Sequence, residues 1–465
     1  MKLSISEVKL SELNLANRID AEHYQPHFLG VIRSVKNKPY KKLSELVSKT
    51  ITTGHTPSMK EESFYGGDVK FIKTDNLREN QIVENFNHFL SDKGANKLKN
   101  AILKNDDIII TIIGATFDVV GRVARIFPDL GRASINQNIS LVRPTIASGY
   151  LTCFLMSKYG KQQLYYLSRQ TEQVNLNNVE VGEILVPLAS DNFIEKIHFL
   201  HTETHNLIIK SKQLYSEAEK MLIKEINLDK YIPNSCGISV RNFIECFNEN
   251  RFDAEYWQPK YDEMIKRVSS IPQKDLIDIV SVKKGVEVGS EAYSDEGKLF
   301  VRVSDFSIYG IDEGEKKIPE ELYEELKDKY KPQKGEVLFT KDGTIGLSFA
   351  LHEDLDVIIS GAFLRLKPKV KINNDYLALV LNSSYCKSQI ERMSGGAIIA
   401  HLKPDSAMKI KIPMLSDKKQ EEIAFKVSEA LRLRKEAKTL LEKAKRAVEI
   451  FIEQNEKEAL VYLSK

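Results

Sequence analysis

The sequence has none of the features that mark a membrane-spanning or exported chain. No apolar run among its 465 residues approaches the ~18–20 residues that cross a bilayer. The N-terminal stretch MKLSISEVKLSEL lacks the apolar core of a signal peptide. Cysteine is scarce, and no CxxC spacing or histidine pair at metal-ligand spacing accompanies Cys153, Cys236, Cys246 and Cys386. We therefore expect a cytoplasmic protein with free thiols, no membrane partner and no metal site.

Motifs of several enzyme classes are also missing. The chain has no GxxxxGK[ST] phosphate loop, no GxGxxG after a strand, no HExxH and no [DN]PP[YFW] tetrapeptide. Asp20 and Glu22 recur as Asp253 and Glu255, which could form a paired acid/base site. Their Tyr, Gln and Pro neighbours better suit a segment that leads into a helix, with Asp as a cap and Pro as a stop. We expect no catalytic residues and no cofactor bound by this chain.

Charge of one sign does not dominate the composition. The formal net charge is +3, with 42% hydrophobic and 29% charged residues, a mixture typical of globular domains. The length allows two to four domains with sizeable cores. Because a nucleic-acid-binding domain is usually strongly basic, any DNA surface here must be a local patch, or partners must supply positive charge.

What the chain does contain is an internal repeat. Asn17–Pro26 reads NRIDAEHYQP and Asn250–Pro259 reads NRFDAEYWQP, identical at seven of ten positions and offset by 233 residues. Further matches follow in the same order, with the offset falling to 224–226: Phe71–Lys73 with Phe300–Arg302, Lys104–Thr111 with Gln333–Thr340, Ser140–Pro144 with Leu364–Pro368, Tyr150–Leu164 with Tyr376–Ile390, and Ile184–Pro187 with Ile410–Pro413. The repeat predicts a pseudo-two-fold molecule, suited to a two-fold target such as duplex DNA, although a duplication can also be an evolutionary relic.

In each half, a mixed region of strands and helices follows the DAExxQP segment. Apolar, β-branched runs bounded by turn residues predict three strands per half. In the first half they are Asp107–Ile113, Val119–Phe127 and Ser134–Val142, and in the second Glu336–Thr340, Ile345–Leu351 and Val357–Leu366.

A long charged helix ends each half. Apolar residues recur at steps of three, four and seven in Phe193–Glu225 and in Lys418–Glu458, and neither segment contains Pro or Gly. The predicted seams are Phe193, Ile197, Leu200, Leu207, Leu214, Ala218 and Met221, and Ile423, Ala430, Leu433, Ala437, Leu440, Ala444 and Ala447. We expect the two helices to pair antiparallel as a spacer between the mixed regions; the alternative is that each packs only on its own region.

These observations predict an α+β fold with two tandem, pseudo-two-fold-related domains separated by two antiparallel coiled-coil spacer helices. The expected division is an N-terminal leading segment at 1–39, a first mixed domain at 40–190, a central spacer helix at 191–228, a second leading segment at 229–270, a second mixed domain at 271–415 and a C-terminal spacer helix at 416–465. The resemblance described next implies that both mixed domains are target recognition domains.

Over essentially its whole length, the chain resembles the specificity (S) subunit of a Type I restriction-modification system. The motifs that carry the resemblance are Gly54–Pro57 followed by Phe64–Asp68, a "GDhhhTRxGxxG" core at Asp106–Gly121 and Gly335–Gly346, an "hxNQN" strand at Ser134–Asn138, and the IxxP that closes each mixed region. The second half departs from the first at Gly285–Val288, which lacks Thr-Pro, at Ser360–Ala362 in place of Asn136–Asn138, and at Lys341-Asp342 in place of Ile112-Ile113. These departures suit two domains that read different half-sites.

The resemblance implies a non-catalytic subunit that binds double-stranded DNA and reads a bipartite, asymmetric target. It implies docking of methyltransferase (M) subunits and of restriction/translocase (R) subunits, which would carry the S-adenosylmethionine, ATP and Mg of the complex. It also implies that the target adenines flip into the M subunits.

Polar residues at strand ends and in turns are the candidates for DNA contact, because loops on a rigid scaffold present donors and acceptors to a groove. In the first half they are Gly54, Thr56, Lys73, Thr74, Asp75, Asn76, Thr111, Gly114, Thr116, Arg122, Asn136, Gln137 and Asn138. In the second half they are Arg302, Ser304, Asp305, Thr340, Lys341, Asp342, Gly343, Thr344, His401 and Lys403. We expect Gly343 to let the backbone approach phosphate.

Other functions stay open at this point. A methyltransferase or nuclease with an unrecognised site would bind S-adenosylmethionine by itself. A coiled-coil scaffold without DNA would lack positive potential on the candidate loops. An orphan specificity subunit would lack a nuclease partner. The sequence does not define the bases read, the gap between half-sites, the partners or the oligomeric state.

Overall fold

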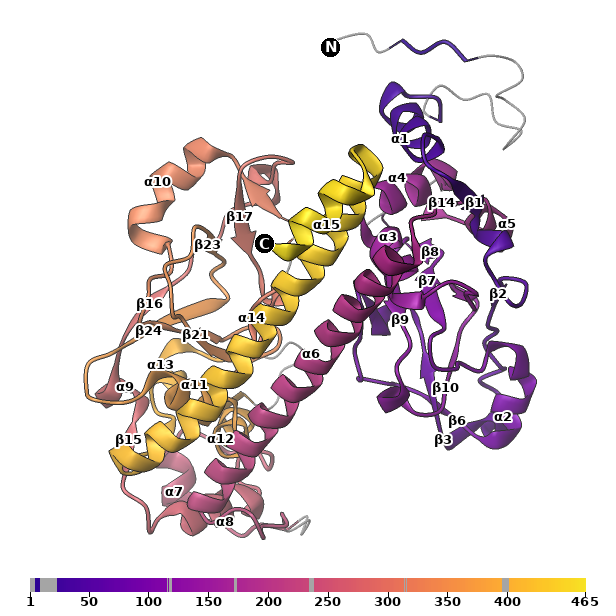
Figure 1. Ribbon diagram of the computed structural model, residues 1–465. Coiled ribbons are helices and arrows are strands. Elements are labelled where there is room, and N and C mark those ends of the chain that lie inside the picture. The colour runs from indigo at the N-terminus through magenta and orange to yellow at the C-terminus, as the bar shows by residue number, and fades with distance from the viewer. Residues whose placement is uncertain are drawn as a thin grey trace. The chain divides into compact units, whose positions relative to one another are not determined.

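The computed structural model describes residues 5–8, 23–114, 116, 119–170, 174–233, 238–312, 314, 316–394 and 401–465. The chain forms two compact units: unit 1 comprises residues 1–206 and 436–465, and unit 2 comprises residues 207–435 (Figure 1). Asn17–Glu22, with the candidate carboxylates Asp20 and Glu22, lies outside the described residues.

Unit 1 contains a mixed αβ region. Its helices are α1 (Pro26–Lys36), α2 (Asp92–Lys97), α3 (Ser148–Met156), α4 (Lys158–Leu167), α5 (Asn178–Gly182) and α15 (Glu456–Ser464). Its strands are β1 (Tyr40–Lys42), β2 (Thr52–Thr53), β3 (Tyr65–Ile72), β4 (Leu77–Arg78), β5 (Gln81–Ile82), β6 (Phe89–Leu90), β7 (Ile108–Thr111), β8 (Ile113–Gly114), β9 (Val123–Arg125), β10 (Ala133–Ile135), β11 (Ile139–Val142), β12 (Arg169–Gln170), β13 (Val174–Asn175) and β14 (Leu185–Pro187).

Unit 2 contains a second mixed region. Its helices are α7 (Phe243–Asn248), α8 (Pro259–Val268), α9 (Leu276–Ile279), α10 (Glu320–Tyr330), α11 (Asn374–Asn382), α12 (Ser384–Ser394) and α13 (Pro404–Ala407). Its strands are β15 (Gln273–Asp275), β16 (Val280–Lys284), β17 (Lys298–Val301), β18 (Phe306–Ser307), β19 (Gly310–Ile311), β20 (Lys317–Ile318), β21 (Val337–Thr340), β22 (Ser348–Ala350), β23 (Ile358–Ile359), β24 (Phe363–Pro368) and β25 (Lys411–Pro413).

The two units share most of their strand topology, which confirms the repeat, although the sheet β12-β13-β8 occurs in unit 1 alone among the described residues. An antiparallel four-stranded sheet has the order β2-β11-β7-β9 in unit 1 and β16-β24-β21-β22 in unit 2. A three-stranded sheet has the order β10-β3-β6 in unit 1 and β23-β17-β20 in unit 2, with the first pair parallel and the second antiparallel in both. The hydroxyls of Tyr150 and Tyr376 donate to the carbonyls of Pro187 and Pro413, each over 2.7 Å. The matched tyrosines therefore fasten α3 and α11 to the final strand of their units.

The prediction of one continuous strand at Ser134–Val142 is wrong. The chain leaves the parallel pair at Ile135, turns, and enters the four-stranded sheet at Ile139. The side chain of Asn136 accepts a hydrogen bond from the amide of Asn138 over 3.1 Å, a local turn that competes with strand pairing. The predicted strand Val357–Leu366 divides in the same way into β23 and β24.

Two long helices run through both units: α6 (Asp191–Glu225) and α14 (Asp417–Glu453). Within unit 1 the rings of Phe193 and Phe451 pack with centroids 5.5 Å apart. Within unit 2 the hydroxyl of Ser211 donates to the carbonyl of Ala430 over 2.7 Å, and Lys419 pairs with Glu225 over 2.9 Å. In both units the start of one helix therefore lies against the end of the other, which confirms the antiparallel pairing.

The predicted seam of α14 is largely its buried face, whereas Leu200, Leu207, Leu214 and Met221 of the α6 seam are only half-buried. Phe193, Ile197 and Ala218 are buried in α6, and Ile423, Ala430, Leu433, Ala437, Ala444 and Ala447 are buried in α14. The periodicity predicted that the second helix ends at Glu458. The helix in fact ends at Glu453. The side chain of Asn455 accepts from the amide of Glu458 and begins the separate helix α15, because an N-cap residue adopts non-helical dihedrals.

In the second copy, the DAExxQP segment caps a turn and starts a helix. Asp253 accepts from the amide of Tyr256 over 3.0 Å, as expected of a cap. The hydrogen bond from Arg251 to Asp253 lowers the pKa of this carboxyl to about 2. Pro26 and Pro259 are the first residues of α1 and α8, so the expectation that they stop a helix is wrong. Proline suits the first helical position because the amide there has no intrahelical partner.

Among the described residues, no helix is long and apolar enough to cross a membrane.

Candidate nucleic-acid interface

In unit 1, predicted DNA-contact residues lie at the carboxyl ends of two parallel strands. Lys73–Asn76 follows β3, and Asn136–Asn138 follows β10. The amide of Asn136 donates to the carbonyl of Ile72 over 3.1 Å and holds these two segments together. Parallel strands place their following loops at one edge of the sheet, where α/β folds often bind ligands.

A third segment, Gly54–Thr56 after β2, joins this edge. The amide of Gly54 donates to the carbonyl of Asn136 over 3.1 Å, and the hydroxyl of Thr56 donates to Oε1 of Gln137 over 2.6 Å. A Cβ atom at Gly54 would lie 1.6 Å from the carbonyl oxygen of Ile135. Only glycine permits this approach, so the three segments form one surface, which we call face 1.

Burial separates the residues of face 1 into two groups. Asn76 and Asn136 are buried. Asn76 accepts from the amide of Lys73 over 3.0 Å and donates to the carbonyls of Val83 and Asn85, so its amide shapes the turn. Asp75 and Gln137 are exposed, and Lys73 and Thr74 are half-buried. The exposed group has the donors and acceptors that a groove could meet.

The remaining candidates of unit 1 lie beside face 1, around the end of β7. The backbone of Thr111 bonds to Arg122 and Gly121, and Nη1 of Arg122 donates to the carbonyl of Leu77 over 3.3 Å. The amide of Ile112 donates to the carbonyl of Asn138 over 2.9 Å, which connects this region to face 1. Thr116 is exposed, whereas Gly114 lies in β8 and Thr111 is buried.

Unit 2 builds the corresponding surface, face 2, with different side chains. Arg302, Ser304 and Asp305 follow β17, and Ser360–Ala362 follows β23. Buried Asp305 accepts from the amide of Arg302 over 2.9 Å and from its Nη2 over 3.3 Å. Asp305 therefore shapes its turn as Asn76 does in unit 1, while Ser304 is exposed.

The turn at Thr340–Thr344 brings together residues far apart in the sequence. The hydroxyl of Thr340 donates to the carbonyl of Thr344 over 2.6 Å, and Gly343 has a φ of +66°, in the left-handed region that favours glycine. Asp342 bonds to the ammonium of buried Lys341 and to Nδ1 of His401. The Lys341 ammonium is therefore used inside the protein, whereas Lys403 at the start of α13 is exposed.

Sequence analysis missed three residues of face 2. Gly285 matches Gly54, because a Cβ atom there would lie 2.1 Å from the carbonyl oxygen of Ser360. Lys283 and Lys284 precede it on the exposed edge strand β16. The adjacent lysine pair and the repeat spacing of the glycine are the signals that could have identified these positions.

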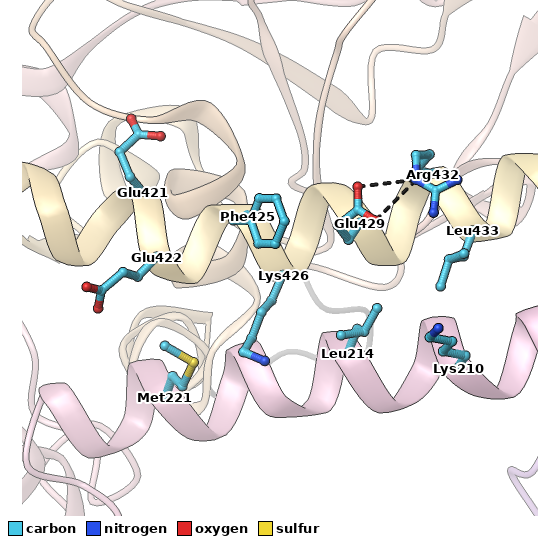
Figure 2. A pocket seen from close by; sticks show the side chains of 10 residues that line it. All are labelled: Lys210, Leu214, Met221, Glu421, Glu422, Phe425, Lys426, Glu429, Arg432 and Leu433. Carbon is cyan, nitrogen blue, oxygen red and sulfur yellow. Dashed lines mark hydrogen bonds and ion pairs between the residues drawn. The ribbon is translucent and has the colours of Figure 1, made fainter.

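A groove of about 730 Å³ lies between α6 and α14 within unit 2. Figure 2 shows Leu214 and Met221 of α6 facing Lys426 and Leu433 of α14. Phe425 projects from α14 beside them and is 67% exposed. An exposed aromatic side chain at an apolar groove is typical of a protein-docking surface.

Buried His201 of α6 lies beside Asn80 and Arg125, and its pKa predicts that the stability of unit 1 depends on pH. Burial, followed by the charge of Arg125, lowers the pKa of His201 to about 3 from its ordinary value of 6.5. The unfolded chain therefore gains a proton below pH ~6.5 that the folded chain excludes, and stability falls as the pH falls. We expect this group to lower the free energy of unfolding by about 2 kcal/mol between pH 8 and pH 5.

Urea unfolding of the wild type and of His201→Gln at both pH values measures this contribution. Glutamine keeps a donor but has no proton to gain, so the variant should lose about 2 kcal/mol less between the two pH values. Equal losses in the two proteins would show that His201 does not cause the acid sensitivity.

Comparison with known proteins gives one family match and several similar solved structures. Residues 268–443 match a family model described as the Type I restriction modification DNA specificity domain. No curated protein matches the chain. Similar solved structures include the S subunit of a Type-I restriction-modification system from M. genitalium, with 14% identity, coverage of 91% of this chain and 96% of that chain, and a TM-score of 0.39. Another is the HsdS subunit from Thermoanaerobacter tengcongensis, with 14% identity, coverage of 90% and 96%, and a TM-score of 0.28.

The matched segment contains all of face 2, and unit 1 repeats its strand order. The specificity domain found in the second half therefore has a counterpart of the same topology in the first. The family match therefore places a Type I restriction modification DNA specificity domain at residues 268–443 of this chain.

Proposed function

We propose that the chain reads a bipartite, asymmetric DNA target, with face 1 on one half-site and face 2 on the other. The observation that carries this proposal is the repetition of one three-segment surface in both units with different exposed side chains. Face 1 presents Asp75 and Gln137, whereas face 2 presents Ser304 and the lysine pair Lys283-Lys284. Side chains with directed donors and acceptors discriminate bases, and lysines contact phosphates. Two different faces require two different half-sites.

The chain supplies recognition, and its partners supply chemistry. We propose that M subunits, which bind S-adenosylmethionine, dock on it for methylation, and that R subunits with ATP and Mg join for cleavage. The groove with exposed Phe425 supports protein docking on the helix pair. Among the described residues, no cluster of three or more His, Cys, Asp or Glu side chains could hold a metal ion.

Methylation mapping tests the function directly. The chain is co-expressed with its neighbouring methyltransferase subunit in a methylation-free host, and N6-methyladenine is mapped by single-molecule sequencing. A two-part motif with a constant gap is expected, and replacing residues 40–188 with another recognition domain should change one half only. No methylation from a complex shown to be assembled and cofactor-loaded would contradict the proposal.

The length of the helix pair should set the gap between the half-sites. Adding one heptad to α6 and one to α14 lengthens the pair by about 10 Å, because each helical residue rises 1.5 Å. We expect a gap longer by about 3 bp, at 3.4 Å per base pair, with both half-sites unchanged. The same mapping measures the gap, and altered half-site sequences would show that the helices do not act as a ruler.

A further inference from the structure

A short hairpin follows the recognition turn in each unit. In unit 1, β4 and β5 follow Lys73–Asn76; in unit 2, β18 and β19 follow Arg302–Asp305. Asn80 and Tyr309 occupy equivalent places at the two hairpin tips. Both tips contact the long helices, but through different chemistry.

The tip of unit 1 is tied to α6 by a hydrogen bond. Asn80 has a φ of +53°, and its amide donates to the carbonyl of Val123 over 2.7 Å. Its Oδ1 lies 2.7 Å from Nε2 of buried His201, whose Nδ1 lies 3.5 Å from Nη1 of Arg125. A guanidinium can only donate, so Nδ1 is the acceptor and Nε2–H donates to Asn80.

The tip of unit 2 is tied to both helices by ring contacts. The guanidinium carbon of Arg434 in α14 lies 4.2 Å from the ring centroid of Tyr309, and the ring of Tyr215 in α6 lies 5.5 Å from it. Nη1 of Arg434 is buried without a hydrogen-bond partner in the described part of the chain. A desolvated guanidinium over a ring gains from the cation–π attraction, so the Tyr309 face takes the place of a hydrogen-bond acceptor.

Each hairpin is fastened to its recognition turn. The amide of Val83 donates to the carbonyl of Asn76 over 2.8 Å, and the amide of Asp312 donates to the carbonyl of Asp305 over the same distance. The turn and the hairpin therefore move together, and the tip contact fixes both on the helix pair.

We propose that Asn80 and Tyr309 are positioning residues for base reading, each controlling the fidelity of one half-site. This inference rests on the proposed function, in which the turns before the hairpins contact DNA. Because the two tips use unrelated contacts, loosening one leaves the other intact. Fidelity at the two half-sites is then set independently, although the units share one topology.

Methylation mapping of tip variants in the assembled complex tests the inference. Asn80→Gly removes the amide but keeps the left-handed backbone, and Tyr309→Ala removes the ring. For Asn80→Gly, we expect methylation at sites with one mismatch in the first half-site to rise three- to tenfold, roughly the effect of one hydrogen bond. Sites mismatched in the second half-site should stay at the wild-type level. Tyr309→Ala should give the reverse pattern.

Two controls separate positioning from general destabilisation. Asn80→Asp keeps an acceptor for His201 and should restore wild-type fidelity, while Gln81→Ala changes the neighbouring hairpin position and should have no effect. Hydrogen exchange of the Val83 amide in the complex should accelerate in Asn80→Gly alone. Equal changes in both halves, or none, with the wild-type motif intact, would overturn the inference. A wild type without a two-part motif would instead overturn the proposed function, and the inference with it.

Discussion

Replacing Arg365 with methionine should lower the free energy of unfolding by about 3–5 kcal/mol, because it leaves a buried carboxylate without its partner. The Nε and Nη2 atoms of Arg365 donate to the two carboxylate oxygens of Glu336 over 2.7 and 2.9 Å. The side chains are 1% and 3% exposed. This pair lies at the base of β21, the strand that leads into the Thr340–Thr344 turn of face 2. Urea unfolding of the full chain measures the effect.

Two controls define what this result means. Arg365→Met combined with Glu336→Leu removes both charges and should recover most of the lost stability, since apolar groups can replace a buried ion pair. Lys371→Met breaks the exposed pair with Asp417 and should leave the free energy of unfolding almost unchanged. A loss below about 1 kcal/mol in Arg365→Met would show that water or another group satisfies Glu336.

The second large effect is expected for Gly54→Ala. The added Cβ would lie 1.6 Å from the carbonyl oxygen of Ile135, so the β2 loop or the β10 end must move. We expect a loss of about 2–4 kcal/mol in the free energy of unfolding, within the range of strained backbone substitutions. Methylation should lose discrimination in the half-site read by face 1 and keep it in the other.

Gly30→Ala is the matched control for Gly54→Ala. Gly30 lies on the exposed side of α1, and an added Cβ would meet nothing within 4 Å. Alanine is the better helix former, so we expect this variant to be more stable by about 0.5–1 kcal/mol. Wild-type discrimination in Gly54→Ala would show that face 1 tolerates the displaced loop.

Much of the fold could be predicted because the chain carries its topology twice. The matched segments predicted the equivalent strands β7 and β21 and the equivalent closing strands β14 and β25. The seven-residue periodicity predicted both long helices. The change of sheet within Ser134–Val142 escaped prediction because apolar periodicity reports burial but not which neighbour a strand pairs with. The end of α14 at Glu453 was not predicted. Asn455 caps the next helix because its backbone is extended, and the apolar pattern does not report backbone conformation.

The sequence predicted which segments form the candidate site. It did not predict which side chains of those segments are exposed. Composition does not distinguish buried Asn76, which shapes its turn, from its exposed neighbour Asp75. Asp342 and His401 are 59 residues apart, and no local pattern indicates that they meet. Gly285 shows the reverse case, since its match to Gly54 in the repeat was visible in the sequence but the backbone that it approaches was not.

The division of the chain between the units also orders its assembly during synthesis. Unit 2 is one uninterrupted segment, 207–435, whereas unit 1 needs residues 436–465 as well. Ala444, Ala447, Val448 and Phe451 fill the same core as Tyr150 and Phe193. During synthesis, the core of unit 1 therefore stays incomplete after residue 206 until more than 200 further residues have left the ribosome. Unit 1 therefore starts before unit 2 and is completed after it, so a product that stops before residue 436 would expose an unfinished apolar surface to chaperones and proteases.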